Sequence, residues 1–137
     1  MLNETSKRRL STVDPRLAAV VEDVAGRMPI MVICGHRTQA EQDDVVRRKL
    51  SKTPWPRSKH NSMPSLAVDL APLKGKAIDW SDAAAFVAMA KAVRQAAAAR
   101  GVAIRWGGDW DRDGLTRADG DRDEVFVDLP HFEIVEG

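Results

Sequence analysis

Apolar side chains recur every three to four residues in three stretches of the chain, which is the spacing of an amphipathic helix. Asp14 can cap the first stretch, and Pro15 suits its first turn. Thr38 and Glu41 form a capping box at the start of the second stretch. The third is rich in alanine, the strongest helix former, and ends at Gly101. We expect helices over residues 15–25, 38–49 and 81–100.

Shorter apolar runs, rich in β-branched side chains, predict strands between and after these helices. The strands are expected over residues 30–34, 66–71 and 102–106, followed by two pieces, 125–127 and 131–135, that Pro130 divides. Residues 51–65 hold three prolines and four serines and predict a loop. A loop of this length in a small domain is often functional or disordered.

Helices and strands alternate irregularly, and no glycine-rich nucleotide-binding turn follows any strand. We therefore predict an α+β fold in which a small, mainly antiparallel sheet packs with three helices. The length of 137 residues fits a single domain. Within it, residues 1–12 are expected to form a flexible or loosely packed N-terminal segment.

The overall charge and composition narrow the possible partners. With 21 basic and 20 acidic residues, the net charge is +1, which gives no general argument for binding nucleic acid. No apolar run reaches the ~18 residues of a membrane span, and no signal-peptide core opens the chain. We expect synthesis in the cytosol and no stable membrane insertion. Cys34 is the only cysteine, so no intrachain disulfide is possible, and we interpret it as a buried, inert thiol.

An aspartate interrupts the apolar run that predicts the second strand. A carboxylate at Asp69 is costly there unless another charge compensates it. A metal ion held by His60, Asp69 and His131 would do so, and Asp128 would be the second carboxylate that metal-dependent hydrolysis needs for proton transfer. The spacing of these residues is not specific, and by itself it leaves open whether a metal site exists.

Five pieces of the sequence resemble one family in their order along the chain. They are GHRTQAEQ (35–42), SKHNSMPSLAVDLAP (58–72), IDW (78–80), IRWGGDWD (104–111) and DLPHFEI (128–134). Together they resemble the zinc peptidases of the D-alanyl-D-alanine carboxypeptidase and L-alanyl-D-glutamate peptidase group, which includes many phage endolysins. Many members have a shorter His-to-Asp spacing with a glycine, where this chain has Pro64-Ser65, so we interpret the segment as a loop variant.

The resemblance implies roles for particular residues. It makes His60, Asp69 and His131 the ligands of one catalytic Zn²⁺. It makes Asp128 the general base, and it places Arg37 against the substrate carbonyl or the developing oxyanion. The implied fold is the Hedgehog/DD-peptidase-like α+β fold.

The same resemblance implies a function. The expected reaction is zinc-dependent hydrolysis of a peptide bond in the peptidoglycan stem, most simply the L-alanyl-D-glutamate bond of a phage-type endolysin. Two alternatives stay open: a D-alanyl-D-alanine carboxypeptidase or dipeptidase, and a non-catalytic, zinc-stabilised binding module. We expect a monomer, made in the host cytoplasm, that acts on the cell wall or periplasm after release.

Several further residues have a functional and a structural interpretation. Gln42 can support Arg37 or be solvated. Asp109 can hydrogen-bond a zinc-ligand histidine or brace a glycine turn, and Trp110 can line the substrate cleft. Trp106 is expected in the core, and His36 in an exposed or locally hydrogen-bonded role. Three of the acidic residues match the opening of a calcium-binding loop, Asp109, Asp111 and Asp113, but Gly120 stands where the loop's last ligand belongs, so a solvated acidic loop is the competing interpretation.

Overall fold

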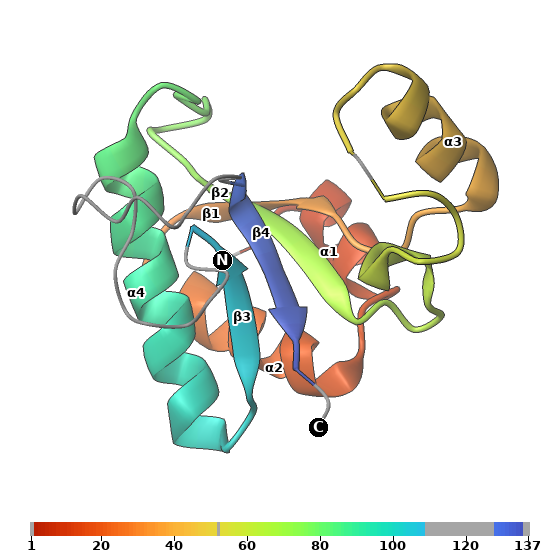
Figure 1. Cartoon of the computed structure of the whole chain (residues 1–137). Helices are drawn as coiled ribbons and strands as arrows, with labels where there is room; N and C mark the ends of the chain where they lie inside the picture. Colours follow the sequence, from red (N-terminus) through yellow and green to blue (C-terminus); the bar gives the residue numbers. More distant parts are fainter. Residues whose placement is uncertain (1, 52, 109–127, 136–137) are drawn as a thin grey trace.

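A four-stranded sheet with strand order β1-β2-β4-β3 forms the centre of the molecule (Figure 1). The computed structural model describes residues 2–51, 53–108 and 128–135. The strands are β1 (Ile30–Cys34), β2 (Ala67–Pro72), β3 (Ile104–Gly107) and β4 (Asp128–Ile134). All three neighbouring pairs are antiparallel. The expected α+β fold with a small antiparallel sheet is confirmed.

Three of the four helices described lie where the sequence predicted them, within two residues at each end. The four helices are α1 (Glu4–Leu10), α2 (Pro15–Ala25), α3 (Gln39–Arg47) and α4 (Ala83–Arg100), with a short 3-10 helix, η1 (Lys59–Asn61), in the long loop. Asp14 accepts a hydrogen bond from the Arg16 amide, and Thr38 and Glu41 form the reciprocal capping box. Gly101 ends α4 with a φ of 69°, a left-handed conformation that favours glycine.

The N-terminal segment differs from the expectation of a flexible or loosely packed stretch. It contains α1, a fourth helix, which packs beside the edge strand β1 and buries Leu2, Ser6 and Leu10. The Ser6 hydroxyl accepts a hydrogen bond from the Val32 amide. The Arg9 guanidinium donates to the Val32 carbonyl. The helix therefore satisfies backbone groups that an edge strand would otherwise expose.

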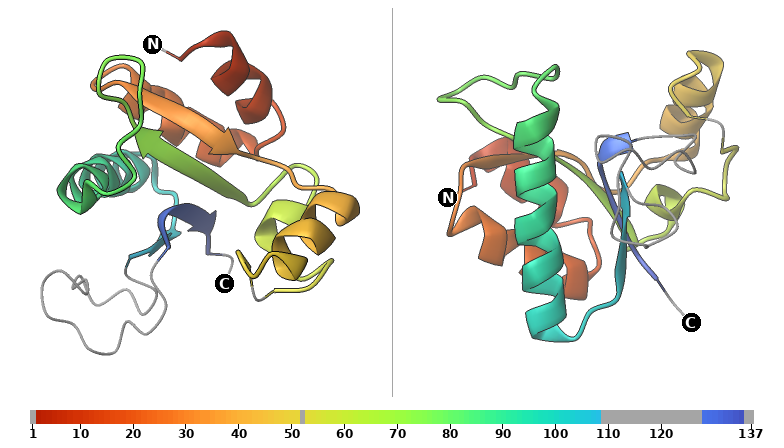
Figure 2. Two further views of the ribbon diagram at one scale, coloured as in Figure 1. Left: turned by 90° about the horizontal axis from the view of Figure 1, so that it is seen from above. Right: turned by 60° about the vertical axis from the view of Figure 1, so that its left-hand side comes forward.

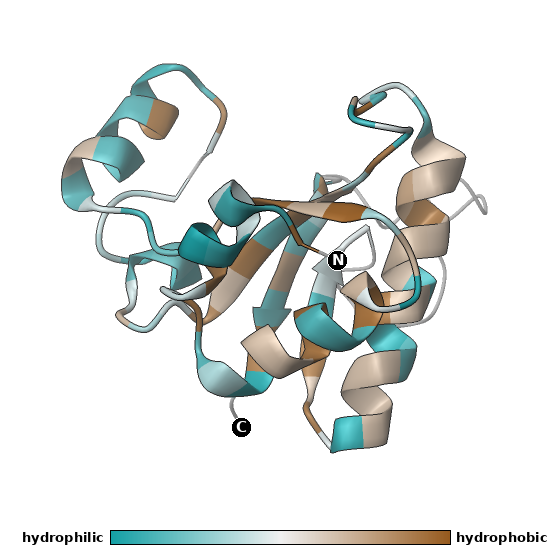
Figure 3. Cartoon of the chain, turned by 180° about the vertical axis from the view of Figure 1, so that it is seen from behind, coloured by the Kyte–Doolittle hydropathy of each residue, from teal (hydrophilic) through white to brown (hydrophobic). Residues whose placement is uncertain are grey.

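The buried face of the sheet packs on α2 and α4. Its side chains alternate along the strands with those of the other face, so Val68, Leu70 and Phe132 point into the core while Asp69 and His131 point away from it. The helix α4 lies on one side of the sheet and α3 on the opposite side (Figures 1 and 2). Coloured by hydropathy, α3 is mostly hydrophilic, whereas α4 is mostly apolar (Figure 3).

Trp106 lies in this core, as expected, with 1% of its surface exposed. Its indole N–H donates to the Leu129 carbonyl, and its ring stacks on Phe132 at a centroid distance of 6.4 Å. No helix in the described part of the chain is long and apolar enough to cross a membrane.

The last strand runs through Pro130, which was expected to divide it. The pairing of β3 with β4 shifts its register between Trp106 and Gly107, whose partners are Phe132 and Asp128. Pro130 falls within this irregular part of β4. Proline lacks a backbone N–H, but the regular hydrogen-bond pattern between β3 and β4 is already interrupted here, so the strand tolerates it. The expected strand over residues 125–127 lies outside the described residues.

Gly107 brings β3 unusually close to the beginning of β4. A Cβ atom at Gly107 would lie 2.0 Å from the Asp128 carbonyl oxygen and 2.9 Å from the Asp128 Cβ. We expect Gly107→Ala to lower the free energy of unfolding by about 1–3 kcal/mol, because the two strands must separate. Urea denaturation measures this loss.

A matched glycine provides the control for this prediction. Gly26 has a φ of −73°, and an added Cβ would meet nothing closer than 3.5 Å. Gly26→Ala should therefore leave the stability unchanged or raise it slightly. Equal stability of the two variants would show that the contact between Gly107 and Asp128 is not tight.

Candidate functional site

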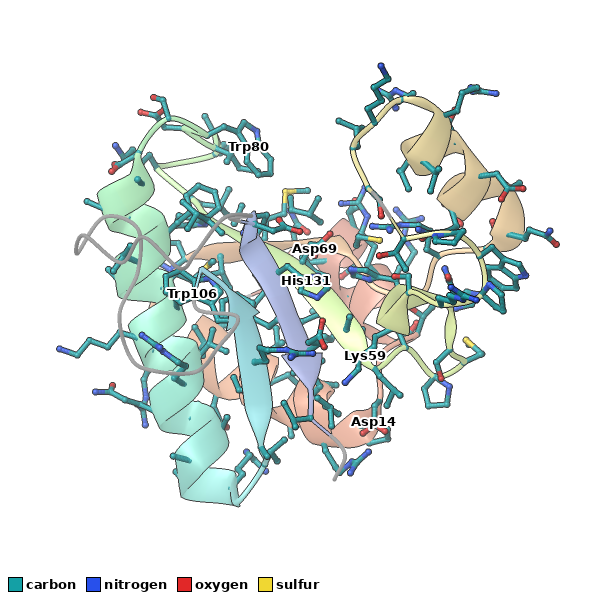
Figure 4. The ribbon with its side chains drawn as sticks, in the orientation of Figure 1. Asp14, Lys59, Asp69, Trp80, Trp106 and His131 are labelled. Atoms are coloured by element: carbon teal, nitrogen blue, oxygen red, sulfur yellow. The ribbon has the colours of Figure 1, made fainter. Side chains whose placement is uncertain are left out.

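Three polar side chains form a row across the sheet on the face opposite the core. In the strand register, Cys34 of β1 is the partner of Asp69 of β2, and Asp69 is the partner of His131 of β4. Register partners project to the same side of a sheet. The sheet therefore brings together residues from distant parts of the chain, and Figure 4 shows Asp69 and His131 side by side.

The long loop adds His60 to this row. It lies in η1, which begins with a reciprocal capping box between Ser58 and Asn61. The His60 Nε2 atom lies 3.2 Å from Asp69 Oδ1, and its Nδ1 atom lies 2.8 Å from the Gly35 carbonyl oxygen. His60 is 2% exposed, so the loop buries it against the sheet.

The two histidines approach the same carboxylate oxygen. His131 Nδ1 also lies 3.2 Å from Asp69 Oδ1, and its Nε2 lies 2.8 Å from Glu133 Oε1. Each ring thus points one nitrogen at Asp69 and holds the other against an oxygen. A second nitrogen bonded to a carbonyl or carboxylate is typical of metal-binding histidines, because that bond fixes the tautomer and the ring orientation.

Charge couples the three groups strongly. Burial alone would lower the pKa of His60 and of His131, but the neighbouring Asp69 carboxylate raises these values to about 10 and about 9. Burial alone would raise the pKa of Asp69, but the two imidazoles hold it far below its usual range. The cluster therefore favours positive charge beside Asp69, which imidazole protons or a divalent cation can supply.

The donor atoms fit a metal ion in two overlapping groups. Ligand atoms of Asp69, Asp128 and His131 lie within 4.8 Å of one another, and so do those of Cys34, His60 and Asp69. Asp69 belongs to both groups. Imidazole nitrogen and carboxylate oxygen are the ligands that zinc takes in hydrolytic sites, so the chemistry of this donor set suits zinc.

Asp128 lies at the beginning of β4, beside this cluster. Burial raises the pKa of its carboxyl, and the negative charge of Asp69 raises it further. A carboxyl group with a raised pKa is a better proton acceptor at neutral pH than an ordinary one. The arrangement therefore places a proton acceptor within 4.8 Å of candidate ligand atoms of Asp69 and His131.

Arg37 faces the cluster from the loop that follows β1. Its Nη2 lies 3.7 Å from Asp69 Oδ2, and its Nη1 donates to Gln42 Oε1 at 2.9 Å. Gln42 is fully buried and also donates to the Thr53 carbonyl, so it joins α3 to the long loop. Asn61 donates to the Arg37 carbonyl and to Gln42. These contacts fix the position of the guanidinium.

The residues of the cluster share one cavity of about 700 Å³. Five of the sequence-predicted site residues line it: Arg37, His60, Asp69, Asp128 and His131. Gln42 lies behind Arg37. His36 was expected in an exposed or locally hydrogen-bonded role, but it is partly buried and its Nδ1 atom lies 2.9 Å from the carbonyl oxygen of Ser62 in the long loop. Four of the predicted residues lie outside the described part of the chain: Asp109, Trp110, Asp111 and Asp113. The predictions of a calcium-binding loop and of a tryptophan in the cleft therefore fall outside the described residues.

Sequence reasoning missed an acid that holds His131. Besides its contact with His131, Glu133 pairs with Arg105 at 2.9 Å and with Lys59 at 3.3 Å. Burial alone would raise the pKa of Glu133, but His131 and Arg105 lower it to about 2. The signal was present, because residues two apart on a strand share a face and the chain reads His131-Phe132-Glu133.

The interpretation of Cys34 as a buried thiol also needs correction. Its side chain is only half-buried, and its Sγ lies 3.9 Å from Arg37 Nη2. It comes at the end of an edge strand, on the side of the sheet that carries Asp69, where the apolar run that predicted burial ends.

Three comparisons place the chain among known proteins. The family model described as "Phage L-alanyl-D-glutamate peptidase" matches residues 1–135. The L-alanyl-D-glutamate peptidase of Escherichia phage T5 is 33% identical over 113 residues, which cover 81% of this chain and 82% of that protein.

Two solved structures also match this chain. The L-Ala D-Glu endopeptidase ChiX of Serratia marcescens superposes with a TM-score of 0.75 at 28% identity, over 98% of this chain and 90% of that one. The vancomycin-resistance D,D-dipeptidase VanXYg matches with a TM-score of 0.50 at 19% identity, over 90% of this chain and 50% of that one. The second likeness concerns the fold alone.

Proposed function

The chain belongs to the phage L-alanyl-D-glutamate peptidase family, and from that premise we propose that it is a zinc-dependent peptidase that cleaves the L-alanyl-D-glutamate bond of the peptidoglycan stem. The observation that carries the zinc assignment is the approach of His60 Nε2 and His131 Nδ1 to one oxygen of Asp69. We assign these three residues as the ligands.

The metal, when bound, would supply a Lewis acid for the scissile carbonyl and lower the pKa of water. Asp128 accepts a proton from the attacking water as the new C–O bond forms. It then passes this proton to the alanyl–glutamyl nitrogen as the C–N bond breaks, so the product leaves as a neutral amine. The raised pKa of Asp128 and its place beside Asp69 and His131 support this role.

Arg37 stabilises the oxygen that becomes negative in the transition state. Its guanidinium lines the cavity, and Gln42 holds it in place. A fixed cation aimed at a developing charge stabilises the transition state more than the ground state, so Arg37 should affect kcat more than KM.

The test of this function is mass spectrometry of purified peptidoglycan digested with the protein. The expected products carry a new alanine carboxyl terminus and a new glutamyl amino terminus. Released D-alanine in their place would indicate a D-alanyl-D-alanine carboxypeptidase or dipeptidase. Intact glycan-linked peptides would indicate a binding module without activity.

A further inference from the structure

The cavity that holds the cluster is lined by an excess of positive side chains. Among its described lining residues, four are cationic and three are acidic: Arg37, Arg57, Lys59 and Arg105 against Asp69, Asp128 and Glu133. A bound divalent cation would increase the positive excess. Such a cavity attracts an anionic substrate and favours it over a neutral one.

Three of the four cations face acids of the site. Arg37 lies 3.7 Å from Asp69, while Lys59 and Arg105 lie 3.3 Å and 2.9 Å from Glu133. Arg57 is exposed and forms no side-chain hydrogen bond or ion pair within residues 2–51, 53–108 and 128–135. Among the cations that line the cavity in those residues, Arg57 is therefore the one whose charge no acidic side chain neutralises, so it is available to bind a ligand.

The backbone beside Arg57 is fixed relative to the reacting groups. The Arg57 amide donates to the Pro54 carbonyl, and the next residue, Ser58, begins the capping box of η1. Asn61 closes that box and donates to the Arg37 carbonyl. Arg57 thus stands on a loop that is tied both to the proposed ligand His60 and to Arg37.

The proposed substrate supplies a matching anion. Glutamate has two carboxyl groups, one on its α carbon and one at the end of its side chain, and only one of them forms the amide bond to the next residue. The D-glutamyl residue on the leaving side of the scissile bond therefore keeps one negative carboxylate. We propose that Arg57 binds this carboxylate and makes the protein selective for glutamate over its amidated form; the assignment rests on the proposed function.

The test compares two synthetic stem peptides that differ only in this group, one with the free D-glutamyl carboxylate and one with the corresponding amide. Wild type should cleave the carboxylate peptide with about a tenfold higher kcat/KM, mainly through a lower KM, since an added charge-assisted hydrogen bond acts on binding. Arg57→Gln should lose this preference and cleave the amide as wild type does. Arg57→Lys should keep part of it, and high salt should reduce it.

The control is Arg27→Gln, which removes an exposed arginine outside the cavity and should keep the full preference. Equal cleavage of the two peptides by wild type, or an unchanged preference in Arg57→Gln, overturns the Arg57 assignment alone. Cleavage of neither peptide by wild type overturns the proposed function, and the assignment falls with it.

Discussion

Replacing Asp128 by asparagine is expected to lower kcat on the stem peptide by about 10²–10⁴-fold while the protein keeps its fold and its zinc. The amide has the same size as the carboxylate but cannot take the proton of the attacking water. The measurement is kcat by product analysis, together with the zinc content of the purified variant. The thermal midpoint should change little, because no described ion pair of Asp128 is lost.

The zinc content separates two roles for Asp128. Its carboxylate lies within 4.8 Å of ligand atoms of Asp69 and His131, so it is placed where a ligand could also stand. Loss of zinc together with activity would make Asp128 a ligand and leave the base unassigned. Asp43→Asn, which changes an exposed acid on α3, is the matched control and should keep full activity.

The sequence predicted the elements that follow from strong periodicity and clear caps. The helices after Asp14 and Thr38 and the helix before Gly101 begin and end within a few residues of their expected limits, because capping and backbone conformation are local properties. The fold class followed from their arrangement. The proposed assignment of His60, Asp69 and His131 as ligands depended on the family resemblance, since the spacing of two histidines and an aspartate is not specific.

Other features could not be predicted, because they arise from contacts between distant segments. The helix α1 has few apolar residues and is held by Ser6 and Arg9 on the edge of β1, a partner that no local pattern reveals. Pro130 is compatible with β4 only because the register with β3 shifts there. The pairing of Glu133 with Lys59 and Arg105 likewise depends on how the loop and β3 come together.

Replacing His60 by alanine is expected to abolish both zinc binding and hydrolysis. A three-ligand site that loses one ligand binds zinc far more weakly, and a binding metal stabilises the folded state in proportion to its affinity. Added zinc should therefore raise the thermal midpoint of metal-free wild type but not that of His60→Ala. Chelation of wild type should remove activity, and zinc should restore it.

Two variants refine the ligand assignment. His36→Ala removes the histidine next to Arg37, whose ring contacts the Ser62 carbonyl and does not line the cavity, and this variant should bind zinc as wild type does. Glu133→Gln weakens the partner that orients His131 and should lower zinc affinity by about 10–100-fold without abolishing binding.

Cys34 provides the decisive comparison, because its thiol belongs to the second group of possible ligand atoms, with His60 and Asp69. Cys34→Ser should keep stoichiometric zinc if His131 completes the site. If a His131→Ala variant kept its zinc and Cys34→Ser lost it, the ion would have to be bound by Cys34, His60 and Asp69. Asp128 does not belong to that group of ligand atoms, so it would not be placed to accept a proton from the attacking water, and its proposed role would be wrong.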